Sequence, residues 1–418
     1  MALFGQKGGR QKTTDYFVAI DAGTNLVKCL VFARTGDDPA KILGKSVIPH
    51  AAGSMRGGMI INIPDAVVTF RQAVEAAAHQ ANVKPTSLLM SMPGDLVKSL
   101  VTTVHYHRAQ PESHIDSGEL KNIVYKAQLK AYEQMRQTMA KEQEEGSLDV
   151  KLINTTVVDM RVDGYKIANP LGFQGGTVTL SIFNVFAPLV HLGALQAIAD
   201  ELELDLISVA AGPYALTRCL TAHNENLSGI FIDVGAQTTD LVVVNEGGIA
   251  GIQNFAFGGN AFSRALALGL KLSDDKAEQI KLDYGNDLLD KRSKIKLQPI
   301  LQAAALMWAR GVTQGLREFT HLDVLPNRIF IGGGGAALPE IKNSLMTKAI
   351  AAELPFTKKP YPALIESTEL HDITVSEGVS LDRSDLVVTG LVYLTIITET
   401  PEDVVGTILR RIALSMQV

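Results

Sequence analysis

Two stretches of the sequence decide the fold: FVAIDAGTNLVKCLVF at residues 17–32 and GIFIDVGAQTTDLVVV at residues 229–244. In each stretch an apolar run enters a polar turn that carries an aspartate and a glycine, and a second apolar run leaves it. This pattern predicts a β-hairpin in both places. The hairpins lie about 210 residues apart, which is far longer than a solenoid period, so we expect two related lobes rather than an array of repeats.

A third stretch, RIFIGGGGAALPEIKNSL at residues 328–345, predicts a strand that runs into four glycines and then a helix. Glycine allows backbone N–H groups to approach an anion closely, and a helix N-terminus adds a positive dipole end. The aspartates of the two hairpin turns would repel a phosphate directly, so they imply a hard divalent cation between the two. Each motif alone is typical of an ordinary turn, but the three in this order indicate a nucleotide site.

The rest of the chain alternates between helical and strand patterns. Apolar periodicity predicts helices over residues 65–81, 116–145, 192–203, 273–284, 299–319 and 339–352, and strands over 87–92, 155–162, 177–183 and 328–331. The apolar run 386–397 is too short to span a membrane, so it is expected to be a buried strand or core helix. His105 and His107 share one side of a strand without a third ligand, so no metal site is predicted there.

Composition excludes several classes of protein. The residues are 46% hydrophobic and 20% charged, which is enough apolar material for sizeable cores. A net charge of −5 argues against a general nucleic-acid binder. The only cysteines, Cys29 and Cys219, exclude a disulfide-rich fold and a cysteine-based zinc cluster. Residues 1–12 form a basic arm without an apolar signal region, so we expect a cytoplasmic protein whose membrane contact is peripheral.

The three motifs resemble those of the actin-like ATPase superfamily, and within it the chain is most similar to the bacterial cell-division protein FtsA. Four further segments carry the closer resemblance: residues 53–77, 88–100, 157–188 and 257–285. The resemblance implies an α/β fold with two lobes built on duplicated ribonuclease-H-like cores, together with an inserted subdomain of the FtsA/PilM type. The implied segments are 13–86 (first lobe), 87–186 (inserted subdomain), 187–226 (first lobe), 227–257 (second lobe), 258–325 (its small subdomain), 326–384 (second lobe), 385–400 (first lobe) and 401–418 (C-terminal helix).

The resemblance also implies that ATP and Mg²⁺ bind between the lobes. The implied Mg²⁺ residues, which act mostly through water, are Asp21, Asp233 and Asp240. The implied nucleotide-binding residues are Gly23, Thr24, Asn25, Lys28, Gly235, Gln237, Thr238, Thr239, Gly258, Gly259, Glu278, Lys281, Gly333, Gly334 and Gly335. For three of these an alternative stays open: Lys28 as a solvated strand residue, and Glu278 with Lys281 as a surface ion pair.

The sequence departs from the superfamily pattern in two places. Many relatives that hydrolyse ATP carry a glutamate just before the proline that stands here at position 213, and this chain has Gly212 instead. The second loop reads Ala236-Gln237 where two glycines are common. A glycine cannot orient an attacking water, so we expect ATP binding with slow or conformationally gated hydrolysis, and no catalytic residue is predicted.

The C-terminal residues predict an amphipathic helix that begins at Thr400-Pro401. FtsA-like proteins end in such a helix, which recruits them to an anionic membrane surface on the cytoplasmic face of the inner membrane. The alternative is that the helix docks on the body of the protein. The residues expected to meet lipid are Val405, Ile408, Leu409, Arg410, Arg411, Ile412 and Met416.

The resemblance implies three kinds of partner: the C-terminal peptide of the tubulin-like division protein FtsZ, further copies of this chain in a filament, and other division proteins. A different function remains open, that of a PilM-like ATP-binding component of the type IV pilus assembly platform. A sugar-kinase or chaperone role ranks last, because no separate substrate domain is left over in the length.

Overall fold

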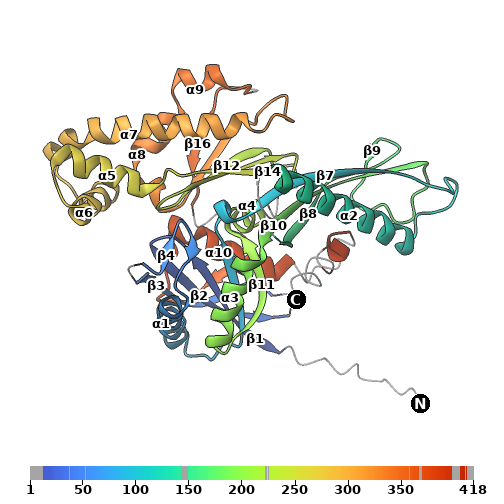
Figure 1. Cartoon of the computed structure of the whole chain (residues 1–418), viewed down its shortest axis with the longest axis horizontal. Coiled ribbons are helices and arrows are strands. Elements are labelled where there is room, and N and C mark those ends of the chain that lie inside the picture. The colour runs from blue at the N-terminus through green and yellow to red at the C-terminus, as the bar shows by residue number, and fades with distance from the viewer. Residues whose placement is uncertain are drawn as a thin grey trace, which may run out of the picture.

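The structure is a computed structural model of the whole chain. It describes residues 13–36, 38–51, 53–142, 149–221, 224, 226–356, 358–366, 370–397, 405–409 and 411. Figure 1 shows two lobes, one above the other, and a smaller subdomain that projects to one side. The two-lobed actin-like fold that the sequence predicts is confirmed by this arrangement.

The first lobe is built on a mixed, mostly buried sheet. The first hairpin is present, since β1 pairs antiparallel with β2, and β6 and β11 then add parallel strands on the other side of β1. The strands lie in the order β11 (Asp205–Ala211), β6 (Ser87–Met92), β1 (Thr14–Ala22), β2 (Leu26–Thr35), β3 (Ala40–Pro49) and β17 (Ile373–Val375). The helices of this lobe are α1 (Ile63–Ala81), α3 (Leu189–Glu201), α4 (Gly212–Thr221) and α10 (Leu386–Ile397).

The second lobe repeats the strand order of the first. Its antiparallel hairpin is β12 with β13, and β15 and β16 add parallel strands beyond β12. The strands lie in the order β14 (Gly248–Phe255), β13 (Thr239–Asn245), β12 (Gly229–Val234), β15 (Arg328–Gly332) and β16 (Tyr361–Leu364). The helices are α5 (Gly259–Leu270), α6 (Asp274–Gly285), α7 (Lys291–Arg317), α8 (Pro339–Leu345) and α9 (Lys348–Glu353). The matching order confirms the duplication that the two hairpins predict.

The inserted subdomain is a four-stranded antiparallel sheet with one long helix, α2 (Ser117–Glu142), packed along it. Asp116 caps the start of α2, because its side chain accepts a hydrogen bond from the Glu119 N–H at 2.8 Å. The strands lie in the order β7 (Lys98–His107), β10 (Thr177–Pro188), β8 (Val150–Val162) and β9 (Tyr165–Lys166), and a separate small hairpin joins β4 (Met55–Arg56) to β5 (Met59–Ile60).

The subdomain boundaries differ from those that the sequence predicts. Strand β6 pairs with β1 and β11 inside the first-lobe sheet, so the inserted subdomain begins after Met92 and not at residue 87. Strand β17 pairs with β3, so the chain has returned to the first lobe by Ile373 and not at 385. Both differences arise because parallel strands are joined through long connections, which short-range patterns do not reveal.

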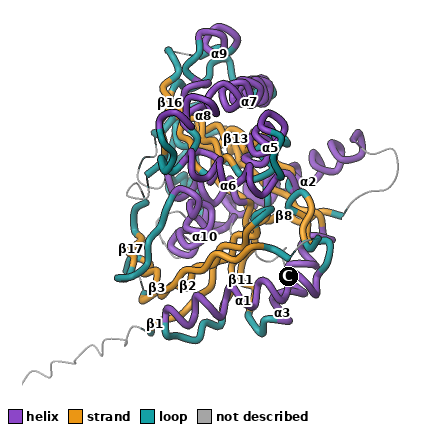
Figure 2. Tube along the Cα trace, turned by 90° about the vertical axis from the view of Figure 1, so that its left-hand side faces the viewer, coloured by secondary structure: helices purple, strands orange, loops and turns teal. Residues whose placement is uncertain are grey.

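Two of the predicted helices also differ from expectation. Helix α7 begins at Lys291 rather than Pro299, because the Asp290 side chain caps its start by accepting hydrogen bonds from the Arg292 and Ser293 N–H groups, and Pro299 lies inside the helix. The predicted helix 339–352 is two short helices, α8 and α9. The apolar run 386–397 is the core helix α10. Figure 2 shows how helices cover the strands of both lobes.

The described C-terminal residues pack against the inserted subdomain. Val405 is 2% exposed and Leu409 is fully buried, in a cluster with Ile123 and Val124 of α2. Ile408 packs against the same cluster, whereas Arg411 is exposed. Arg410, Ile412, Met416, the predicted helix start at Thr400 and the arm 1–12 lie outside the described residues. Within the part of the chain that the structure describes, no helix is long and apolar enough to cross a bilayer.

Candidate nucleotide-binding site

The first polar turn lies at the end of the β1–β2 hairpin, where Asp21 is held in place from the next strand. Ser91 of β6 donates a hydrogen bond to Asp21 Oδ1 at 2.6 Å and accepts one from the Ala22 N–H at 3.3 Å. On the other side of the turn, His50 Nε2 lies 2.9 Å from the Gly23 carbonyl oxygen. Burial lowers the pKa of His50 despite that contact, so the ring is neutral at pH 7. These partners fix the carboxylate of Asp21 toward the gap between the lobes.

The second polar turn faces the first from the other lobe and is joined to the start of helix α5. The turn is closed by a hydrogen bond from the Gly235 N–H to the Thr238 carbonyl at 2.9 Å. The Gly259 N–H donates to the Gly235 carbonyl at 2.9 Å, and the Asn260 N–H donates to the Ala236 carbonyl at 2.8 Å. A Cβ at Gly258 would lie 2.6 Å from the Gly235 carbonyl oxygen, so only glycine fits there. The turn and the N-terminus of α5 therefore form one rigid unit.

The glycine-rich turn after β15 crosses directly over the end of β12. Gly333 has φ +86°, a left-handed conformation that favours glycine, and a Cβ there would overlap Asp233 Oδ1. The Gly333 N–H donates to the Arg383 carbonyl at 3.2 Å, and Gly334–Ala337 continue as a short 3-10 helix. The glycines thus bring bare backbone to the edge of the cleft beside an acidic group.

The three predicted Mg²⁺ residues form an acidic cluster that Lys28 compensates only in part. Burial raises the pKa of Asp233 to about 6, with Lys28 opposing that rise and Asp21 adding to it. Burial also raises the pKa of Asp240 well above its usual range, and the neighbouring carboxylates of Asp233, Asp95 and Asp21 raise it further. Asp240 Oδ1 is buried without a hydrogen-bond partner. Such a cluster lacks positive charge, which a bound cation supplies.

The arrangement suits a hydrated cation rather than a fully protein-bound one. Among the residues that the structure describes, no group of three or more His, Cys, Asp or Glu side chains could hold a metal ion directly. Mg²⁺ keeps several waters and commonly uses only one or two carboxylates together with substrate phosphates. The residues Asp21 and Asp233 therefore fit Mg²⁺ that arrives with a nucleotide and is held mostly through water.

Both open alternatives for the lysines are decided by their contacts and burial. Lys28 is not a solvated strand residue, since its Nζ donates to the Ser384 carbonyl oxygen at the cleft. Lys281 is 8% exposed, and its Nζ lies 2.7 Å from Glu278 and donates to the Gly259 carbonyl at 3.2 Å. Glu278 also accepts a hydrogen bond from Ser263 of α5. The Glu278–Lys281 pair is thus an i,i+3 ion pair with a buried lysine and an exposed glutamate side chain, and both residues also link α6 to α5.

An inner cavity of about 230 Å³ lies between the lobes and brings most of the predicted residues together. Its lining includes, among the predicted residues, Asp21, Gly23, Thr24, Asn25, Lys28, Asp233, Gly235, Thr238, Asp240, Gly259, Glu278, Lys281, Gly333, Gly334 and Gly335. Gly212 also lines this cavity. The position at which many ATP-hydrolysing relatives carry a glutamate therefore faces the cleft in this protein.

Three predicted residues do not line the inner cavity. Gln237 and Gly258 line a larger outer cavity of about 1090 Å³. Thr239 is fully buried in the second lobe, where its hydroxyl donates to the Phe257 carbonyl at 2.7 Å and accepts from Trp308 Nε1 at 2.9 Å. Thr239 is therefore a core residue: strand alternation turns it to the opposite side from Thr238, a period-2 signal that the sequence already carried.

Sequence reasoning missed four polar residues at the cleft or directly behind it: Asn260 and Ser384 line it, whereas Ser91 and His50 hold the first polar turn from behind. Ser91 holds Asp21, His50 holds the Gly23 carbonyl, Ser384 accepts from Lys28, and Asn260 faces Asn25. The sequence predicts Ser91 only as part of the strand over residues 87–92. Strand β6 runs parallel to β1, so its C-terminal end, where Ser91 lies, reaches the same edge of the sheet as Asp21. A strand predicted to pair in this way is the sequence signal that could have pointed to Ser91.

The sequence is similar to those of known bacterial cell-division proteins. The family model for cell division protein FtsA matches residues 230–368. The FtsA of Neisseria meningitidis serogroup B is 25% identical over 272 residues, which cover 65% of this chain and 61% of that protein. The FtsA of Bacillus subtilis is 22% identical over 350 residues, covering 78% and 75% respectively. Over these segments the chain is similar to FtsA proteins.

The fold has a close solved counterpart in the PilM–PilN type IV pilus biogenesis complex. The TM-score is 0.65 at 13% sequence identity, and the match covers 91% of this chain and 98% of the other. At this identity the likeness concerns the fold alone. The chain matches about three fifths of the length of two FtsA relatives, those of Neisseria meningitidis and Pseudomonas aeruginosa.

Proposed function

We propose that this protein binds ATP with Mg²⁺ between its lobes and acts in bacterial cell division as an actin-like, filament-forming adaptor. The observation that carries the proposal is the cleft itself, in which two polar turns with buried carboxylates face each other beside a glycine-rich turn. Backbone N–H groups and hydroxyls suit phosphate oxygens, and the acidic cluster suits the cation that accompanies them.

Isothermal titration of the full chain with ATP and ADP tests nucleotide binding, with and without Mg²⁺. We expect tight binding only when Mg²⁺ is present, because the incompletely compensated carboxylates of Asp21 and Asp233 repel bare phosphates. Binding that is equally tight without Mg²⁺ would contradict the role given to the acidic cluster. No binding of either nucleotide would refute the proposal.

We infer that hydrolysis is slow or gated. The residue at the start of α4 is Gly212, which has no side chain to orient an attacking water, and it lies at the inner cavity. Rapid steady-state release of phosphate by the unmodified protein would contradict this inference.

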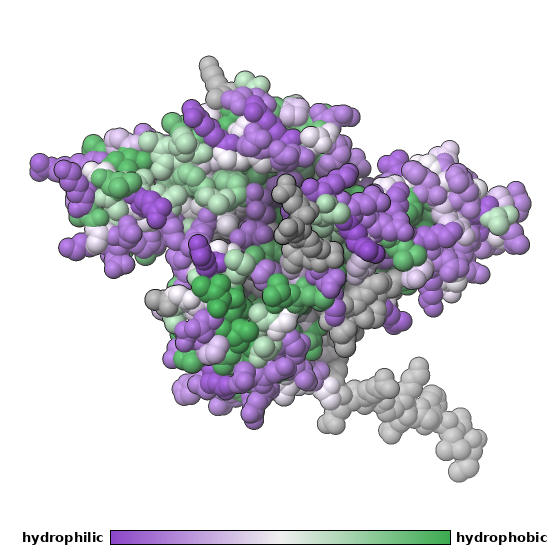
Figure 3. Space-filling model, viewed as in Figure 1, coloured by the Kyte–Doolittle hydropathy of each residue, from purple (hydrophilic) through white to green (hydrophobic). Residues whose placement is uncertain are grey.

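We propose further that the adaptor tethers FtsZ filaments to an anionic membrane surface and interacts there with other division proteins. The apolar tail residues support the membrane part, and they must leave the inserted subdomain first, because Val405 and Leu409 are buried against it. Figure 3 shows apolar side chains gathered on the second lobe, and the exposed Leu268 and Met307 of the outer cavity offer a surface there for a peptide partner. Pull-down with an FtsZ C-terminal peptide tests the partner.

A PilM-like role in a type IV pilus platform is the second candidate. Two observations favour it: the likeness to PilM over 91% of the chain, and the packing of the tail residues on the protein instead of their exposure. Co-sedimentation with anionic vesicles separates the two functions. A chain that neither pellets with vesicles nor captures the FtsZ peptide supports the PilM-like function.

A further inference from the structure

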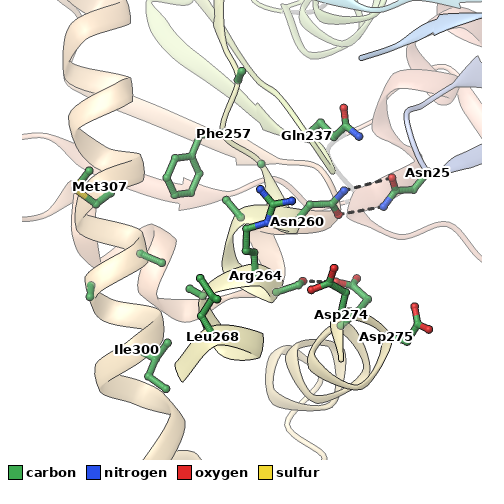
Figure 4. A pocket seen from close by; sticks show the side chains of 18 residues that line it. Asn25, Gln237, Phe257, Asn260, Arg264, Leu268, Asp274, Asp275, Ile300 and Met307 are labelled. Carbon is green, nitrogen blue, oxygen red and sulfur yellow. Dashed lines mark hydrogen bonds between the residues drawn. The ribbon is translucent and has the colours of Figure 1, made fainter. Parts of the chain in front are cut away.

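Two asparagines from opposite lobes form a reciprocal side-chain pair at the mouth of the cleft. Asn25 Nδ2 donates to Asn260 Oδ1 at 3.1 Å, and Asn260 Nδ2 donates to Asn25 Oδ1 at 3.4 Å (Figure 4). Asn25 ends the β1–β2 turn of the first lobe, and Asn260 is the second residue of α5 in the second lobe. Each side-chain amide donates one hydrogen bond to the other and accepts one from it, so an uncharged pair joins the two lobes at this point.

The pair stands where two cavities meet. Asn25, Asn260 and Glu278 line both the inner cavity of about 230 Å³ and the outer cavity of about 1090 Å³. Cavities that bury a whole small ligand measure roughly 300–1,000 Å³. The inner cavity alone lies below that range, so a nucleoside triphosphate that fills it also passes the boundary at which Asn25 and Asn260 meet. Opening of the lobes requires the Asn25–Asn260 pair to separate.

The backbone of Asn260 is hydrogen-bonded to the second polar turn, so Asn260 moves together with that turn. Its backbone N–H donates to the Ala236 carbonyl at 2.8 Å, and the preceding Gly259 N–H donates to the Gly235 carbonyl. Lys281 donates to the Gly259 carbonyl and so ties α6 to the same place. A displacement of this turn by a bound phosphate therefore reaches the Asn260 side chain through rigid backbone contacts.

We propose that the Asn25–Asn260 pair is a latch that controls how fast nucleotide enters and leaves the cleft. The proposal rests on the nucleotide binding proposed above and assigns a role to Asn260 that goes beyond it. The latch stabilises the closed arrangement of the lobes both before and after nucleotide binds. Loss of the latch thus accelerates entry and exit together, and it changes the equilibrium affinity little.

Stopped-flow measurement with a fluorescent ADP analogue and Mg²⁺ tests the latch on the full chain. We expect Asn260→Ala to raise both the association and the dissociation rate constant by about tenfold, as two neutral hydrogen bonds are lost, while Kd stays within about twofold. Asn25→Ala breaks the same pair from the other lobe and supplies a second variant if Asn260→Ala does not fold. The double variant, Asn25→Ala with Asn260→Ala, should have rate constants no higher than those of either single variant, because each substitution removes the same pair of hydrogen bonds.

Leu306→Ala is the matched control, since Leu306 is 53% exposed on α7 of the second lobe and lines neither the inner nor the outer cavity. We expect it to leave both rate constants unchanged. If only the dissociation rate rises in Asn260→Ala, Asn260 is a plain nucleotide contact and the latch is refuted. Unchanged rates also overturn the latch but leave nucleotide binding intact. If the unmodified chain binds no nucleotide, both proposals fall together.

Discussion

Replacement of Asp233 by asparagine should make the nucleotide-free protein more stable while it weakens nucleotide binding. Burial raises the pKa of this carboxyl from 3.8 to about 6 in the folded protein. One pKa unit corresponds to about 1.4 kcal/mol, so ionised Asp233 costs the fold about 3 kcal/mol at pH 7. A neutral amide at this position has no charge to desolvate, so Asp233→Asn should raise the free energy of unfolding by up to that amount.

The sign of the pH dependence follows from the direction of the shift. The folded pKa lies above the unfolded one, so the folded state holds the extra proton between about pH 4 and pH 6. The wild-type free energy of unfolding therefore falls relative to that of Asp233→Asn as the pH rises through this window, and the difference is constant above it. Taking the difference between the two proteins cancels the titration of the groups that do not interact with Asp233; Asp240, whose pKa is raised by Asp233, does interact with it.

Urea unfolding of both proteins at pH 4.5, 5.5, 6.5 and 7.5 measures this difference, and Asp205→Asn, at an exposed strand end, is the control. We expect the gain in stability from Asp233→Asn to grow from pH 4.5 to 6.5 and to disappear when Mg²⁺ and ATP are added to the wild type. A variant that is no more stable than wild type at pH 7.5 would show that the buried charge is already compensated, and the argument for a cation at the cluster would fail.

Three further outcomes test other parts of the reasoning. Gly258→Ala should destabilise the fold by roughly 1–3 kcal/mol in urea unfolding, since its Cβ would lie 2.6 Å from a carbonyl oxygen, whereas Gly193→Ala on the open face of α3 should be neutral or slightly stabilising. Gly212→Glu, whose Cβ meets the Val387 side chain at 3.2 Å, should raise steady-state phosphate release at least about tenfold, and an unchanged rate would show that the missing glutamate does not limit hydrolysis. Leu409→Asp should abolish pelleting with anionic vesicles; a wild-type chain that does not pellet either would favour the docked tail and the PilM-like function.

The hairpins and the glycine-rich turn were predictable because their signals are local. A strand–turn–strand pattern needs only neighbouring residues, so the sequence alone predicts β1–β2, β12–β13 and the turn at 332–335. Most of the residues that the resemblance implies line the inner cavity, and their contacts with a nucleotide stay a prediction. Local alternation also distinguishes Thr238, which lines this cavity, from Thr239, which is buried in the core.

What the tertiary structure alone decided are the contacts between distant segments. Parallel pairing carries β6 and β17 into the first-lobe sheet, and no short-range pattern encodes that pairing. Burial decides that Lys28 and Lys281 are internal links, and that Val405 and Leu409 rest on the inserted subdomain. An amphipathic helix presents the same apolar stripe to a protein groove as to a lipid surface, so its sequence cannot choose between them. Only the three-dimensional structure shows that Val405 and Leu409 lie against the inserted subdomain.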